Sequence, residues 1–65
     1  MSEKMFIEIK IIAKSKSMII AQHGGTILVF KDELINLIET EVKPNNTYSL
    51  YIDSENYDYA LFNAL

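Results

Sequence analysis

The chain has 65 residues, of which 49% are hydrophobic, and a formal net charge of −3. A chain of this length forms one small domain, residues 1–65, with a thin core, so self-association as a homo-oligomer is a reasonable way to bury more surface. The sequence contains no cysteine and no arginine. It therefore excludes disulfides and thiolate metal sites, and it counts against sequence-specific nucleic-acid recognition, in which arginine is the preferred residue.

The charges are unevenly distributed. Residues 1–31 carry five lysines and two acids, whereas residues 32–65 carry seven acids and one lysine. No apolar stretch approaches the ~20 residues of a membrane span, and residues 1–4 lack the pattern of a secretory signal, so we expect a cytoplasmic protein without a membrane partner. Abundant Ile, Lys, Asn and Tyr without Arg suits an AT-rich genome, such as that of a phage or plasmid.

Three strands are predicted in the first half of the chain. Residues 5–11 carry apolar side chains at every second position, which indicates a half-buried strand. Residues 18–23 and 26–30 follow as two further strands, and Gly24-Gly25 between them predicts a two-residue hairpin with a type I′ turn. Residues 26–30 are apolar without alternation, so we expect this strand to be covered on both faces and to lie centrally in an antiparallel meander.

An amphipathic helix is predicted next, over residues 33–43. Its apolar residues recur at helical spacing, and Asp32 is a plausible N-cap. Glu39 and Lys43 are four residues apart, which allows a favourable ion pair on the helix surface. Pro44 disfavours helical structure at the residue before it, so the helix should end there.

The last third of the chain predicts a strand and then a helix. Residues 47–52 alternate, with Tyr48, Leu50 and Ile52 expected to face the core. Residues 54–65 fit a helix whose N-cap is the residue at position 53 or 54, and whose apolar stripe ends at the C-terminal leucine. The alternative is a fifth strand that follows a hairpin loop.

The predicted fold class is α+β, with a small antiparallel sheet of about four strands packed with one central amphipathic helix. The predicted order of elements is β-β-β-α-β-α, and it becomes β-β-β-α-β-β if the last segment is a strand. Both orders place one helix between the third and fourth strands.

The candidate partner-binding residues are tyrosines interleaved with carboxylates in the C-terminal part: Tyr51, Asp53, Glu55, Tyr57, Asp58 and Tyr59. Tyrosine is enriched at interfaces because its rigid apolar ring ends in a polar group, and neighbouring carboxylates attract a basic partner. The alternative is that the rings complete the core while the acids solvate a loop. This pattern predicts a small non-enzymatic binding or accessory protein that docks on or inhibits a partner protein.

A second hypothesis is non-specific nucleic-acid binding through Lys10, Lys14 and Lys16 on the first hairpin. The alternative is a solvated hairpin whose lysines discourage edge pairing. No catalytic residue is predicted, because the sole histidine, His23, adjoins a glycine turn and has no nucleophile or orienting acid nearby in the sequence. No cofactor or metal is predicted either, since three acids between residues 53 and 58 are too few to hold Ca²⁺.

The stretch Tyr51-Ile52-Asp53-Ser54-Glu55-Asn56 resembles the opening strand motif of NYN-type, PIN-like ribonuclease domains. In that family the strand ends in an aspartate that helps to hold the catalytic metal, and an asparagine and a helix follow. The resemblance implies that Asp53 is the metal-binding acid and Asn56 the nearby asparagine of a metal-dependent nuclease module. That family also uses acids from later strands, which this sequence does not supply after the motif.

Overall fold

The computed structural model describes residues 3–38 and 41–65. Within these residues the chain forms four strands, one short 3₁₀ helix and one α-helix: β1 (Lys4–Lys14), β2 (Met18–His23), β3 (Thr26–Lys31), η1 (Asp32–Leu37), β4 (Thr47–Asp53) and α1 (Ser54–Asn63). The strands make one antiparallel sheet in the order β3-β2-β1-β4. The predicted α+β class is confirmed, and the final segment is a helix rather than a fifth strand.

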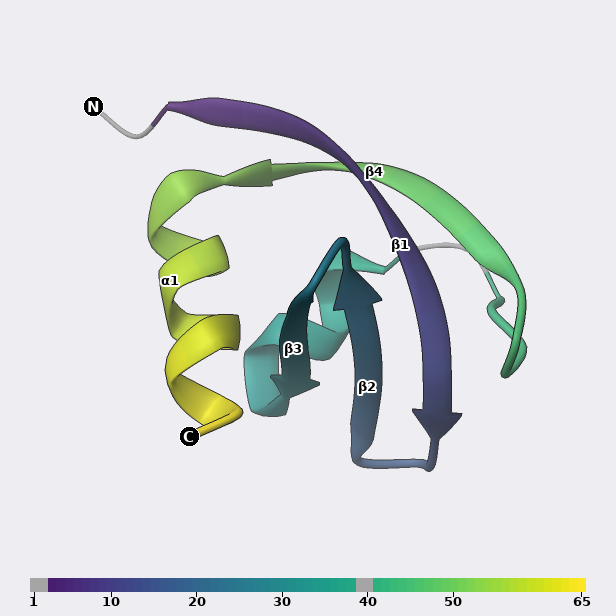
Figure 1. The fold of residues 1–65 in the computed structure, drawn as a ribbon. Helices are drawn as coiled ribbons and strands as arrows, with labels where there is room; N and C mark the ends of the chain where they lie inside the picture. The colour runs from purple at the N-terminus through teal and green to yellow at the C-terminus, as the bar shows by residue number, and fades with distance from the viewer. Residues whose placement is uncertain (1–2, 39–40) are drawn as a thin grey trace.

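The long strand β1 is shared between two partners. Its first part, Lys4–Lys10, pairs with β4, and its last part, from Lys10 to Lys14, pairs with β2. A β-bulge between Ile11 and Ala13 interrupts the second ladder. Bulges increase strand twist, and β1 accordingly curves across the molecule from β4 towards β2 (Figure 1).

The core lies on the concave face of this curved sheet. The predicted alternation in β1 is confirmed, because Ile7, Ile9 and Ile11 are all buried. Leu28 and Phe30 of β3 are fully buried against the same cluster. Apolar burial therefore links β1 with β3, although the two strands are not neighbours in the sheet.

The prediction that residues 26–30 form a central strand is wrong, since β3 lies at an edge of the sheet. Its second neighbour is α1, which packs beside it (Figure 1). The side-chain amide of Asn63 donates a hydrogen bond to the carbonyl oxygen of Val29 at 3.3 Å. A strand carries a continuous apolar run when other elements cover both of its faces, and helical segments such as α1 and η1 do this at an edge as well as in the middle of a sheet.

The hairpin at Gly24-Gly25 is confirmed, with His23 paired to Thr26 across the two-residue turn. Of the two glycines, only Gly24 has a left-handed backbone, at φ +60°. A positive φ at the first central residue alone is the pattern of a type II′ turn, so the expected type I′ geometry is wrong.

The amphipathic segment after β3 is shorter and tighter than predicted. It forms the six-residue 3₁₀ helix η1, and Lys31 rather than Asp32 occupies the N-cap position. Asp32 has a left-handed φ of +56°, which is uncommon outside glycine. Ile35, Asn36 and Ile38 are β-branched or polar residues with weak helix propensity, which favours a short 3₁₀ piece over a regular α-helix.

The apolar stripe of this segment nevertheless faces the core as predicted. Leu34, Leu37 and Ile38 are partly buried against the core, and Val42 is buried within it. The proposed pair between the residues at positions 39 and 43 lies outside the described residues. Hydrophobic burial therefore places this segment although its backbone is not α-helical.

The C-terminal helix α1 begins after Asp53, which occupies the N-cap position without a side-chain capping bond. Ala60 is fully buried, and Tyr57 and Leu61 are partly buried against the core. Leu65, expected on the same stripe, is 99% exposed because it lies beyond the last turn of the helix. No helix in the described part of the chain is long and apolar enough to cross a membrane.

Candidate functional site

The outer face of α1 carries aromatic and acidic side chains together. Glu55, Asp58, Tyr59 and Phe62 line a shallow hollow of about 470 Å³. Their spacing of three, four and seven residues places them on one side of an α-helix. Tyr59 is 62% exposed and Phe62 is 70% exposed, so neither ring is used to complete the core.

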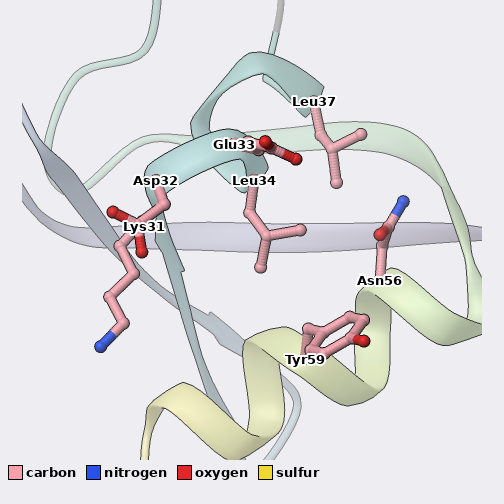
Figure 2. Close-up of a pocket in the computed structure, with 7 residues that line it drawn as sticks. All are labelled: Lys31, Asp32, Glu33, Leu34, Leu37, Asn56 and Tyr59. Carbon is pink, nitrogen blue, oxygen red and sulfur yellow. The ribbon is translucent and has the colours of Figure 1, made fainter.

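A second hollow of about 410 Å³ separates α1 from η1. Leu34 and Leu37 point from η1 towards Asn56 and Tyr59 of α1 (Figure 2). Tyr59 lines both hollows. It therefore forms a ridge between them and connects them into one surface.

We call this the α1–η1 surface, and it comprises Lys31, Asp32, Glu33, Leu34, Leu37, Glu55, Asn56, Asp58, Tyr59 and Phe62. Its centre is formed by leucine and aromatic side chains, whereas its four carboxylates are exposed. Lys31 is the one cationic residue in this set. The surface thus combines an apolar centre with a net negative rim, which attracts cationic groups.

The six predicted partner-binding residues do not form one site. Glu55, Asp58 and Tyr59 lie together on the α1–η1 surface. Tyr51 lies on β4, 67% exposed, with its ring centroid 4.7 Å from that of its cross-strand neighbour Phe6. The sequence alternation in β4 directs this ring to the convex face of the sheet.

The two remaining candidates are partly buried. Asp53 ends β4 opposite Lys4 of β1. Tyr57 points inward from α1, and its hydroxyl lies 2.8 Å from Nδ1 of His23 at the end of β2. The two rings meet edge to face with centroids 5.6 Å apart. This contact ties the hairpin to the helix, so the geometry gives Tyr57 and His23 a structural role.

The sequence reasoning missed Phe62, Asn56 and the two leucines of η1 as surface residues. Phe62 follows Tyr59 by three residues, so helical spacing alone predicts that the two rings lie on one side of a helix. Leu34 and Leu37 belong to the apolar stripe of the predicted amphipathic helix, and they are partly buried against the core. Their second contact, with the hollow beside α1, depends on the packing of two distant segments.

The three lysines proposed for nucleic-acid binding do not share one face of the sheet. Lys10 shares the convex face of β1, opposite to the buried isoleucines. The β-bulge reverses the alternation, so that Lys14 pairs with the buried Ile19 and its Nζ donates to the carbonyl oxygen of Val42 at 3.2 Å. Lys16 lies in the turn between β1 and β2.

The acids of the C-terminal segment do not gather into a metal site in the described parts of the chain, where no group of three or more His, Cys, Asp or Glu residues has a suitable arrangement. Asp53, the residue suggested by the nuclease resemblance, lies at the end of an antiparallel edge strand. Comparison with protein-family models, with curated proteins and with solved structures found no match.

Proposed function

We propose that this protein is a small non-enzymatic accessory or inhibitory protein of the cytoplasm that docks on a partner protein through the α1–η1 surface. The observation that carries the proposal is the position of Tyr59, which is 62% exposed between two hollows. Interface hot spots are commonly aromatic residues at the centre of a patch with a polar rim. The four carboxylates around it supply such a rim.

The partner segment that fits this surface is a basic amphipathic helix. Its apolar side chains would enter the hollow between α1 and η1, where Leu34, Leu37 and Tyr59 supply apolar contacts. Its lysines or arginines would lie near the surrounding carboxylates, which also accelerates association at low salt. An amphipathic helix that binds in a groove presents apolar anchor side chains three or four residues apart. Tyr59 and Phe62 are likewise three residues apart on α1, so the anchors of a bound helix can contact both rings.

A designed probe tests this proposal directly. An amphipathic helical peptide of leucine and lysine is titrated into the labelled protein, and amide chemical shifts are followed by NMR. We expect shifts centred on the α1–η1 surface, at Leu34, Leu37 and Tyr59 and at the neighbouring Glu55, Asp58 and Phe62, and an affinity that falls as salt is added. A matched peptide of leucine and glutamate should not bind. Shifts spread over the whole sheet, or equal binding of both peptides, would contradict the proposal.

Two variants separate ring contacts from charge. Tyr59→Ala should weaken peptide binding by about 2 kcal/mol, or ~30-fold, since a central aromatic anchor is lost. Phe6→Ala is the matched control, because Phe6 is also 62% exposed but lies on the convex face of β1. Glu55→Gln combined with Asp58→Asn should flatten the salt dependence while the fold is retained. Equal effects of the Tyr59 and Phe6 substitutions would refute the assignment of the surface.

A further inference from the structure

The two edges of the sheet differ in how they are covered. At one edge, α1 packs beside β3, and Asn63 of α1 donates a hydrogen bond to the backbone carbonyl of Val29. At the other edge lies β4, whose pairing partner is β1. Among residues 3–38 and 41–65, no strand pairs with the outer side of β4. A strand edge of this kind is a template for pairing with another chain.

The hydrogen bonds to β1 determine which backbone groups of β4 point outward. The amide of Ser54 donates to the carbonyl of Glu3 at 2.8 Å, and the amide of Ile11 donates to the carbonyl of Asn46 at 2.9 Å. Hydrogen-bonded pairs recur every second residue in an antiparallel ladder, so the even-numbered residues of β4 bond to β1. The N–H and C=O groups that turn away from β1 belong to Thr47, Ser49, Tyr51 and Asp53.

The side chains near this edge favour the addition of a strand. Charged residues and proline usually protect an exposed sheet edge against pairing. β4 has neither from Thr47 to Ile52. A hollow of about 330 Å³ beside it is lined in part by Leu37, Tyr48 and Leu50. The alternate side chains of an added strand would cover this hollow.

We propose that a second copy of this chain occupies the edge, with its β4 antiparallel to the first β4, so that two four-stranded sheets join into one. The register follows from the outward groups: Leu50 lies opposite Leu50 of the second copy, and Ser49 lies opposite Tyr51. This register aligns the outward-facing N–H and C=O groups of the two strands. It also brings the two apolar Leu50 side chains together, and it places each Asp53 opposite Thr47 rather than opposite another acid. The strand is therefore complementary to itself, and the thin core of a 65-residue chain gains buried surface.

Solution mass and amide exchange of the full chain test the proposal. Light scattering should give about twice the monomer mass of 7.5 kDa, with dissociation on dilution. In the dimer the amides of Ser49 and Tyr51 should be protected from hydrogen exchange, and dilution should remove this protection while that of Leu50 persists. A monomeric mass at millimolar concentration, or fast exchange of both outward amides there, would overturn the proposal.

An edge variant with a matched control completes the test. Ser49→Pro removes an outward N–H, and proline is tolerated where that group faces away from the sheet, so we expect a folded monomer. Ser49→Ala keeps the N–H and should remain dimeric. If the proline variant does not fold, Tyr51→Lys serves instead. Each copy then carries a lysine at position 51, and the antiparallel pairing brings the two positive charges close together. A Tyr51→Lys chain that stays dimeric with protected outward amides would refute the pairing.

Discussion

Replacement of Tyr57 by phenylalanine removes one hydroxyl group and leaves the ring in place. That hydroxyl lies 2.8 Å from Nδ1 of the partly buried His23, so the variant loses one hydrogen bond and leaves a ring nitrogen without this partner. A hydrogen bond of this kind contributes about 1 kcal/mol net. A domain of this size has a total stability of roughly 3–10 kcal/mol, so the loss is a substantial fraction. We expect a melting temperature about 4–8 °C lower.

Thermal and urea unfolding followed by circular dichroism measure this difference. Tyr59→Phe is the matched control, because the same chemical change is made two residues away on a ring that faces solvent. It should leave the melting temperature unchanged. In a His23→Ala background, Tyr57→Phe should have almost no further effect, since the two groups act as a pair. Equal melting temperatures for Tyr57→Phe and Tyr59→Phe would show that the contact does not stabilise the fold.

Two further substitutions test the turn and the core. Gly24→Ala should destabilise the protein by about 1 kcal/mol, because the residue has a φ of +60° although nothing lies within 4 Å of an added Cβ; Gly25→Ala, whose φ is outside the left-handed region, should cost less. Phe30→Ala should cost about 3–5 kcal/mol, since its side chain is fully buried, and calorimetry should find a much lower melting temperature. Phe62→Ala should leave the unfolding transition in place, and a large loss there would contradict the exposure of that ring.

The effect of salt distinguishes partner binding at the α1–η1 surface from the pairing of two copies through β4. Docking of a basic partner on the α1–η1 surface should weaken as ionic strength rises, because screening reduces the attraction to the carboxylates. Pairing of two copies through β4 should not weaken, since each copy carries a net charge of −3 and screening reduces their repulsion. Failure of peptide binding would therefore leave the strand pairing untouched, and the reverse also holds.

Much of the architecture followed from residue patterns. The alternation of Ile7, Ile9 and Ile11 predicted both a strand and the face that it buries, because the side-chain period of a strand is two. The two glycines predicted a hairpin, and the helical spacing near the C-terminus predicted α1. These signals are local, and a few neighbouring residues suffice to generate them.

Local residue patterns predict only part of the candidate site. Glu55, Asp58 and Tyr59 are predicted together because tyrosines and carboxylates are interleaved in this segment of the sequence. Tyr57 was grouped with them, but its hydroxyl contacts His23, which is 34 positions away in the sequence. Helical spacing places Tyr57, but not Tyr59, on the stripe of Ala60 and Leu61, whereas the local pattern does not identify a partner as distant as His23.

The sequence alone determined where the four strands lie and which faces of the elements are apolar, because these properties depend on period and propensity, but it left the last segment open between a helix and a strand. Tertiary structure decided that β3 is an edge strand beside α1, that η1 is a short 3₁₀ helix, and that Tyr59 lies between two hollows. An apolar side chain gains the same free energy when a strand, a helix or a second chain covers it. Burial patterns therefore show that a surface is covered, and only the folded arrangement shows by what.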